Sequence, residues 1–229
     1  MTSVPLVSCI MPTARRPHFV PRAVEFFLRQ QYPNRELIVV DDGAQRVDHL
    51  IPNLPSIRYR RLETPLCLGE KRNIGCELAA GEIIAHWDDD DWIGPWRLTT
   101  QVNELEVRGA DASGLSTLLY FDPVRRLACR WQSTLMTWLA GGSLCYRKAI
   151  WSATPFRLLD SGEDTAFVHD AGPARFVDMA DASFYVAVVH GANTSARPGT
   201  GSAWNAVDVS QVRHLMGADM ERYYACSTS

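Results

Sequence analysis

The sequence predicts an α/β fold, a mostly parallel central sheet flanked by helices, and three observations support this prediction. Short apolar, β-branched runs alternate with helical segments through the first 92 residues. Strand–helix–strand order of this kind is typical of parallel sheets that helices cover on both faces. Thr13, Asp41–Asp42 and Asp88–Asp91 each follow a predicted strand directly. Because ligands bind at the carboxyl ends of such strands, we expect these polar groups to meet at one edge of the sheet.

The first half of the chain contains four predicted strands and two predicted helices. The strands are residues 7–11, which Pro12 should stop, then 37–40, 57–62 and 82–87. Three arginines in the strand at 57–62 indicate an edge position. Apolar residues recur at helical spacing between 18 and 31, and the next helix covers 70–80 and ends at Gly81.

The second half is less regular. A helix is predicted at 95–108, with Pro95 in its first turn and Gly109 after its end. Strands are predicted at 116–121, 127–131 and 143–147, an apolar run at 184–189, and helices at 165–169 and 213–224. Residues 191–202 are rich in Gly, Ser, Thr and Asn, which is the composition of a mobile loop.

Composition excludes several classes of protein. The 229 residues are 46% hydrophobic and 21% charged, as in ordinary globular proteins, and the net charge of −3 gives no support to a nucleic-acid or anionic-membrane binder. No apolar segment approaches the ~20 residues of a membrane span, and residues 1–5 do not resemble a signal peptide. The six cysteines are scattered and lack zinc-ligand spacing. We therefore expect a reduced, cytoplasmic protein without a transmembrane segment.

The most informative segment is the acidic run Asp88–Asp91, which follows the apolar run Ile83–Ala85. Four adjacent carboxylates repel one another, and a divalent cation removes that penalty. Mg²⁺ and Mn²⁺ prefer oxygen ligands and are readily shared with the phosphates of a substrate. The run therefore predicts a metal-dependent enzyme that acts on a phosphorylated donor; a solvated acidic turn or a casual Ca²⁺ site is the alternative.

Several motifs occur in an order that resembles the family 2 glycosyltransferases of the GT-A (Rossmann-like) fold. They are residues 7–13 (VSCIMPT), 36–43 (ELIVVDDG), 68–75 (LGEKRNIG) and 80–84 (AGEII), which lead into the acidic run. The resemblance is strong to Trp92, moderate to Asp164 and weak beyond. Ala44 replaces a frequent serine, and His86–Trp87 replaces a commoner aromatic–leucine pair. These departures leave the nucleobase open.

The resemblance implies an inverting, metal-dependent glycosyltransferase. Such an enzyme moves a sugar from a nucleotide-diphosphate donor, with UDP-sugars favoured, to an acceptor hydroxyl. Asp88 and Asp90 match the two acids of the DxD motif, with Asp88 nearer the ribose and Asp90 on Mn²⁺ or Mg²⁺. Asp89 belongs to the donor-binding segment, although its side chain is expected to point away into solvent. Asp91 is expected on the acceptor side.

Further donor contacts come from the earlier motifs. Pro12 and Thr13 would present backbone groups to the base, and Thr13 could equally cap the next helix. Asp41 and Asp42 would accept hydrogen bonds from the base or ribose; the alternative is a turn stabilised by aspartate at a strand end. Arg72 is expected at the pyrophosphate, where a guanidinium pairs well with anionic oxygens. The alternative for Arg72, and the expectation for Lys71, is a surface helix charge. Asn73 is expected in the donor site as well, where it would brace the turn.

The catalytic base is expected in the later half. Gly162–Glu163–Asp164 resembles the family's Glu-Asp motif, which makes Asp164 the base and Glu163 a second group that orients or binds the acceptor. Partial burial of such a pair would raise one pKa toward neutrality. The alternative is a capping acid before the helix at 165–169.

The remaining predictions concern the metal and the acceptor. His190 would complete the metal shell, or serve a structural role at a strand end. Acceptor contacts are expected from Asp91, Trp92, Gly142 and Trp138. Trp131 and Trp204 are further candidates for an aromatic platform, and every tryptophan has a core position as its alternative. The loop at 191–202 would close over bound donor.

We expect one domain over residues 1–229, with residues 1–92 as the nucleotide-sugar half and 93–229 as the acceptor half. The acceptor stays open among a glycan, a lipid-linked sugar, a protein and a small molecule. A homodimer and a peripheral position at the inner membrane face are compatible with the chain.

One rival function is that of a nucleotidyltransferase that makes nucleotide sugars, but residues 12–17 lack the glycine-rich phosphate loop. The other is a non-catalytic nucleotide- or glycan-binding module, against which retention of every expected acid argues.

Overall fold

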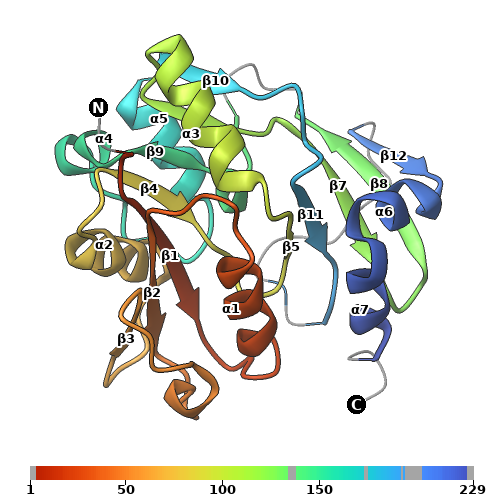
Figure 1. Cartoon of the computed structure of the whole chain (residues 1–229), viewed down its shortest axis with the longest axis horizontal. Helices are drawn as coiled ribbons and strands as arrows, with labels where there is room; N and C mark the ends of the chain where they lie inside the picture. Colours follow the sequence, from red (N-terminus) through yellow and green to blue (C-terminus); the bar gives the residue numbers. More distant parts are fainter. Residues whose placement is uncertain (1–3, 134–137, 173–174, 192, 194–202, 226–229) are drawn as a thin grey trace.

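A computed structural model describes residues 4–133, 138–172, 175–191, 193 and 203–225. Within it, seven strands form one sheet in the order β10-β6-β9-β4-β1-β2-β3 (Figure 1). Strands β1 to β4 pair in parallel, and β9 is antiparallel to both of its neighbours. Their bounds are β1 Val7–Thr13, β2 Arg35–Asp41, β3 Ile57–Arg61, β4 Ile83–His86, β6 Ala112–Gly114, β9 Cys145–Arg147 and β10 Phe176–Asp178. The predicted mostly parallel central sheet is confirmed.

Helices cover both faces of this sheet. Alternate residues of each strand point to opposite faces, so each strand packs against helices on both sides. Val7, Cys9 and Met11 pack with α1 and α3, whereas Ile10 packs with α2 and α5. The helices are α1 Val20–Leu28, α2 Leu68–Leu78, α3 Arg97–Arg108, α4 Lys148–Ala153, α5 Glu163–Ala171, α6 Val209–Met216 and α7 Glu221–Ala225. Short 3₁₀ turns lie at Asp48–Leu50, Gly141–Ser143 and Gly217–Met220.

A second, five-stranded sheet was not predicted as a unit. Its order is β12-β8-β7-β11-β5, and its strands are β5 Trp92–Ile93, β7 Thr117–Asp122, β8 Leu127–Gln132, β11 Tyr185–Val188 and β12 Trp204–Val207. Helices α6 and α7 lie against this sheet, on the side of the molecule that is blue in Figure 1. Strand β5 directly follows the acidic run, so the run passes from one sheet to the other.

Two boundaries differ from the prediction for identifiable reasons. Strand β1 continues through Pro12 to Thr13, because β4 pairs with it only as far as Ile10. From there β1 pairs on one side only, where a missing backbone N–H is tolerated. The predicted final helix at 213–224 is instead α6, a 3₁₀ turn and α7, with Gly217 at a positive φ of 55° between them.

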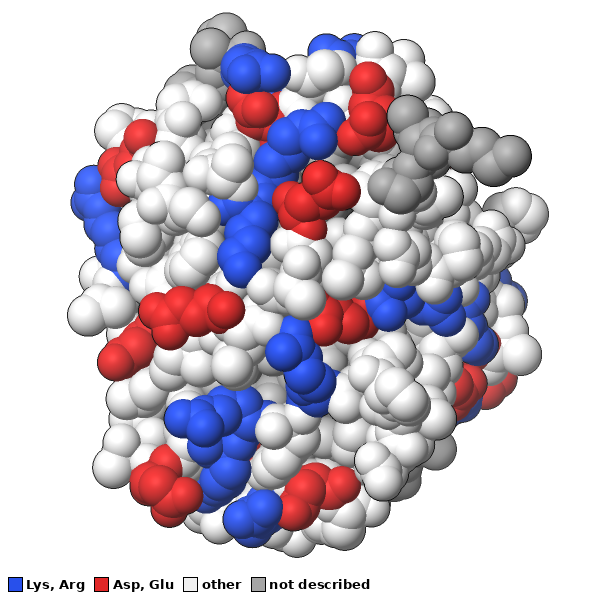
Figure 2. All heavy atoms as spheres, turned by 60° about the vertical axis from the view of Figure 1, so that its left-hand side comes forward, with Lys and Arg blue, Asp and Glu red and all other residues white. Residues whose placement is uncertain are grey.

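The charge on the surface and the apolar character of the helices indicate which kinds of partner to consider. On the face in Figure 2, acidic and basic side chains are interspersed, and no broad area of a single sign is visible. Among the described helices, none combines the length and apolar character that crossing a bilayer requires.

Candidate active site

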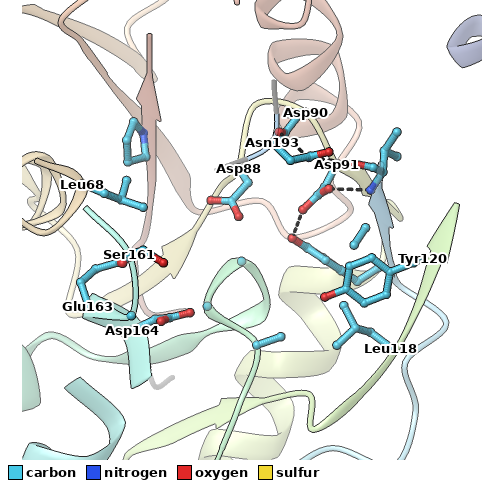
Figure 3. A pocket seen from close by; sticks show the side chains of 18 of the residues that line it. Leu68, Asp88, Asp90, Asp91, Leu118, Tyr120, Ser161, Glu163, Asp164 and Asn193 are labelled. Carbon is cyan, nitrogen blue, oxygen red and sulfur yellow. Dashed lines mark hydrogen bonds between the residues drawn. The ribbon is translucent and has the colours of Figure 1, made fainter. Parts of the chain in front are cut away.

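A cavity of about 190 Å³ lies beyond the carboxyl end of β1 and is lined by residues of both sheets (Figure 3). The central sheet contributes Pro12, the loop after it Arg16, helix α2 Arg72, and the acidic run Asp88, Asp90 and Asp91. The second sheet contributes Leu118, Tyr120, Tyr185 and Ala187. The remaining wall comes from Trp138, Gly141, Gly142, residues 160–164 and Asn193. The predicted convergence of polar groups at this edge is therefore realised for part of the set.

Asp88 and Asp90 both face the cavity. The Asp88 side chain is 28% exposed, and its Oδ1 lies 3.5 Å from Nη2 of Arg72. Oδ2 of Asp90 lies 2.9 Å from Nε2 of His190 and is also paired with Arg16. Burial opposes ionisation of Asp90, but the hydrogen bond to His190 and the charge of Arg16 together hold its pKa below the usual value. Asp90 is thus kept as a carboxylate beside an imidazole.

Asp89 is not in solvent, which corrects the expectation that it points away from the protein. It is 1% exposed, and its Oδ2 accepts a hydrogen bond from Oγ1 of Thr13 at 2.6 Å. Its Oδ1 lies 2.7 Å from Nη2 of Arg16. Burial raises the pKa of Asp89 to about 7 despite Arg16. Thr13 and Asp89 therefore link the loop after β1 to the acidic run, and neither lines the cavity.

Asp91 fastens the acidic run to the second sheet. One of its oxygens accepts a hydrogen bond from the Tyr185 hydroxyl and the other from the backbone N–H of Val188 at 2.8 Å. Burial raises the pKa of Asp91 well above its usual value. The side chain still borders the cavity, as Figure 3 shows, but its hydrogen bonds are directed at β11.

Glu163 and Asp164, the predicted catalytic pair, differ in burial and in hydrogen bonding. Glu163 is 2% exposed, and its Oε1 accepts a hydrogen bond from Nε of Arg72 at 3.0 Å. Burial raises the pKa of Glu163 even though Arg72 opposes this. Asp164 is only partly buried and faces the cavity, with one oxygen accepting the backbone N–H of Thr165 at 2.7 Å. Asp164 is therefore the member of the pair that a ligand can reach.

Gly141 and Gly142 lie between the two groups of acids. A Cβ on Gly141 would stand 2.1 Å from Oδ2 of Asp164, and one on Gly142 would stand 2.4 Å from Oδ2 of Asp88. Two hydrogen bonds fix this turn. The Gly141 carbonyl accepts one from Nδ1 of His86 at 2.7 Å. The Gly142 carbonyl accepts a bond from Nη2 of the buried Arg97 at 2.9 Å. Only glycine permits carboxylates to approach this turn so closely.

Asp41 and Asp42 are engaged by the protein itself. Asp41 is fully buried and accepts bonds from the N–H of Gly43 at 2.8 Å and the hydroxyl of Tyr59 at 2.7 Å. Asp42 accepts bonds from the N–H of Leu66 at 2.9 Å and from Nζ of Lys71 at 2.9 Å. These contacts favour the alternative, a turn stabilised at a strand end. Neither residue borders the cavity.

Two further expectations, for Lys71 and Trp92, are corrected by burial, and the brace expected from Asn73 is present. Lys71 is 8% exposed, so it is not a surface charge. Asn73 braces α2, since its amide bonds the carbonyl of Phe156 at 2.9 Å and accepts from Nε1 of Trp151 at 2.8 Å. Trp92 is 2% exposed in the core, with Nε1 bonded to Asp219 at 3.0 Å, and does not line the cavity. Neither Trp92 nor Asn73 borders the cavity.

Arg16, Tyr120 and Tyr185 were missed. Arg16 lies three residues beyond Thr13, the end of β1, so a wider search around the strand ends could have found it. Tyr120 and Tyr185 read as ordinary strand residues, and only the pairing of β7 with β11 brings them to the cavity. Most of the predicted loop at 191–202 lies outside the described residues.

The residues present fit a divalent cation if a substrate completes its shell. Within the described part of the chain, no three His, Cys, Asp or Glu side chains converge as a ready-made metal site. Asp90 and His190 nevertheless bring a carboxylate oxygen and an imidazole nitrogen within 2.9 Å, and Asp88 opens into the same cavity. Mg²⁺ and similar ions are usually held by one or two carboxylates together with substrate phosphates and water. The donor set is of that kind.

Comparison with known proteins identifies relatives of this chain. The sequence model described as Glycosyl transferase family 2 matches residues 8–177. WcaA of Escherichia coli, a putative colanic acid biosynthesis glycosyl transferase, is 38% identical over 104 residues, which are 43% of this chain and 37% of that protein. The chain thus spans less than half the length of the curated relatives that it matches.

Two solved structures share the fold. TarS 1-349 of S. aureus in complex with UDP-GlcNAc superposes with a TM-score of 0.67 at 17% identity, over 96% of this chain and 73% of that one. The mannosyltransferase PcManGT of Pyrobaculum calidifontis, in complex with GDP-Man and Mn²⁺, has a TM-score of 0.65 at 16% identity, over 82% and 57% of the two chains. At such identities the likeness concerns the fold alone.

Proposed function

Because this chain belongs to glycosyl transferase family 2 and has a GT-A fold, we propose that it is an inverting, metal-dependent glycosyltransferase. The donor is a nucleotide-diphosphate sugar, with a UDP-sugar favoured, and the acceptor is a hydroxyl group. One observation carries the proposal: Asp164 and the pair Asp88–Asp90 open into one cavity on either side of the Gly141–Gly142 turn. A base and a site for a charged leaving group are thereby combined.

In this proposal the acidic run serves the leaving group. Asp90, His190 and Asp88 would hold Mn²⁺ or Mg²⁺, and the ion when bound would neutralise charge that develops on the departing diphosphate. Arg72 lies at the same wall, and its Nη1 is buried without a hydrogen-bond partner among the described residues. A guanidinium N–H in that state is suited to an anionic oxygen of the donor.

Asp164 is the base. It would accept the proton of the acceptor hydroxyl as the oxygen attacks the anomeric carbon, in a single displacement that inverts the configuration. Glu163 serves a different purpose, because its carboxylate already accepts a hydrogen bond from Arg72 and is closed to solvent. It positions the guanidinium. Asp91, through Tyr185 and Val188, keeps the acidic run against the second sheet.

Incubation with a panel of UDP-sugars and Mn²⁺, with release of UDP as the readout, tests the proposal. Asp164→Asn should lower kcat by about 10³-fold and leave the affinity for UDP within twofold. EDTA should abolish UDP binding to the wild-type protein. Release that survives Asp164→Asn would reject the base, and nucleotide binding that is indifferent to EDTA would reject the metal site.

A further inference from the structure

A fully buried arginine, Arg97, lies behind the cavity wall at the start of α3. Burial of a cation is costly unless an anion pairs with it, yet its guanidinium donates hydrogen bonds to neutral oxygens of Gln101 and Gly142. Its Nη1 has no hydrogen-bond partner among the described residues. A cation in the first turn of a helix also opposes the helix dipole. Helix stability therefore does not account for an arginine at this position.

Arg97 contacts two parts of the wall that flank Asp88. Its Nη2 donates a hydrogen bond to the Gly142 carbonyl at 2.9 Å, and its guanidinium carbon lies 5.4 Å from the centroid of the Tyr185 ring. A Cβ on Gly142 would stand 2.0 Å from the Tyr185 hydroxyl and 2.4 Å from Oδ2 of Asp88. The Tyr185 hydroxyl in turn donates a hydrogen bond to Asp91. Arg97 is thus one residue removed from both Asp88 and Asp91.

The guanidinium of Arg97 is itself held in place. Its Nε donates to Oε1 of Gln101 at 2.9 Å, and the Gln101 amide donates to the Ser143 carbonyl at 2.8 Å. The ring centroid of Trp87 lies 5.5 Å from the guanidinium carbon. An arginine suits these surroundings, because its planar set of donors bonds two acceptors while its faces pack on aromatic rings. Helix α3 therefore determines where the Gly142 carbonyl lies.

The neighbouring carbonyl has a different anchor. The Gly141 carbonyl accepts a hydrogen bond from Nδ1 of His86 at 2.7 Å. His86 belongs to β4 and is as fully buried as Arg97. A Cβ on Gly141 would approach Asp164, whereas a Cβ on Gly142 would approach Asp88. The two glycines are therefore anchored separately, and each lies against a different acid of the proposed site.

We propose that Arg97 is a positioning residue for the leaving-group end of the site, where Asp88 faces the cavity. This inference rests on the proposed function and assigns Arg97 a task within it. Through the Gly142 carbonyl and the Tyr185 ring, Arg97 keeps the glycine turn and the acidic run at a fixed separation. Asp88 is thereby held in the place where it serves the diphosphate of the donor and its cation.

Binding of UDP in the presence of Mn²⁺, measured by titration calorimetry, tests this role without turnover. Arg97→Met fills much of the same volume and removes the donor to Gly142. It should weaken UDP about tenfold, as expected when a group that orients a metal ligand is lost. Arg97→Lys keeps a donor that can reach the Gly142 carbonyl, and it should restore the affinity to within about threefold of the wild type.

His86→Phe is the matched control, because it removes the donor to the adjacent carbonyl from an equally buried position. It should leave the affinity for UDP unchanged. Urea titrations of every variant allow affinities to be compared at similar free energies of unfolding. Should Arg97→Met not fold, Gln101→Met takes its place. That variant releases Nε of Arg97 and the Ser143 carbonyl, and should also weaken UDP while His86→Phe does not.

The outcomes distinguish this inference from the proposed function. A wild-type protein that does not bind UDP with Mn²⁺ would overturn the proposed function. Normal binding by the wild type, together with equal UDP affinities of Arg97→Met and His86→Phe, would overturn the role of Arg97 alone. So would an Arg97→Met protein that binds UDP as tightly as the wild type, or an Arg97→Lys protein that binds no better than Arg97→Met.

Discussion

Substitution of Gly141 by alanine should displace the catalytic base while leaving the fold intact. The new Cβ would lie 2.1 Å from Oδ2 of Asp164, whereas ordinary contacts begin at 3.4 Å. The backbone of Gly141 is not left-handed, so alanine is tolerated there. The carboxylate must therefore retreat by about 1 Å, and because Cγ and Cβ of Asp164 would also lie only 2.8 and 2.9 Å from the new Cβ, the first turn of α5 must shift with it. A misplacement of that size lowers kcat by about 100-fold, or about 2.7 kcal/mol of transition-state stabilisation.

The assay compares Gly141→Ala with Gly142→Ala. Gly142→Ala directs its Cβ at Tyr185 and at Oδ2 of Asp88, 2.4 Å away, so it should weaken binding of UDP with Mn²⁺. Gly141→Ala should instead keep the dissociation constant of UDP within twofold and keep the far-UV circular dichroism of the wild type. A Gly141→Ala enzyme with undiminished kcat would refute the role of Asp164, and so would equal effects of both variants on UDP affinity.

Three further predictions concern the surroundings of the site. His86→Phe removes the donor to the Gly141 carbonyl and should lower the free energy of unfolding by about 1–3 kcal/mol in urea titrations, together with kcat; an unchanged free energy would contradict the bond. Tyr59→Phe should cost about 1 kcal/mol at pH 8. Because burial and the bond to Asp41 raise the pKa of Tyr59 to about 12, this stability is present below pH 10 and lost as the pH rises through 12. Denaturation across that range should show wild type and variant converge. Asp90→Asn should make the affinity for UDP, measured by calorimetry, insensitive to Mn²⁺, and a persistent Mn²⁺ dependence would argue against Asp90 as a ligand.

The sequence was sufficient to predict the four parallel strands β1 to β4 of the central sheet and the position of the acidic run after β4. β-branched runs bounded by Pro, Gly and Asp predicted β1 to β4, and the amphipathic spacing from Val20 to Leu28 predicted α1. Short strands such as β6 and β10 were missed, because three residues give no detectable period. Their existence depends on long-range pairing, which no local pattern encodes.

Site residues were harder to predict because burial decides the role of a carboxylate. Asp41, Asp89 and Asp164 are the same residue type after strands or turns, yet only Asp164 borders the cavity. Asp41 and Asp89 are held by partners that lie 18 and 76 residues away, Tyr59 and Thr13. A pattern of neighbouring letters contains no information about such partners.

The most direct test of the account is a crystal structure with UDP and Mn²⁺, recorded with anomalous scattering at the manganese edge. We predict a manganese peak within about 2.2 Å of Asp90 oxygen and His190 nitrogen, bridged to the diphosphate, with the Asp164 carboxylate facing the cavity. Nucleotide bound without a manganese peak, with Asp90 still paired to Arg16, would contradict it.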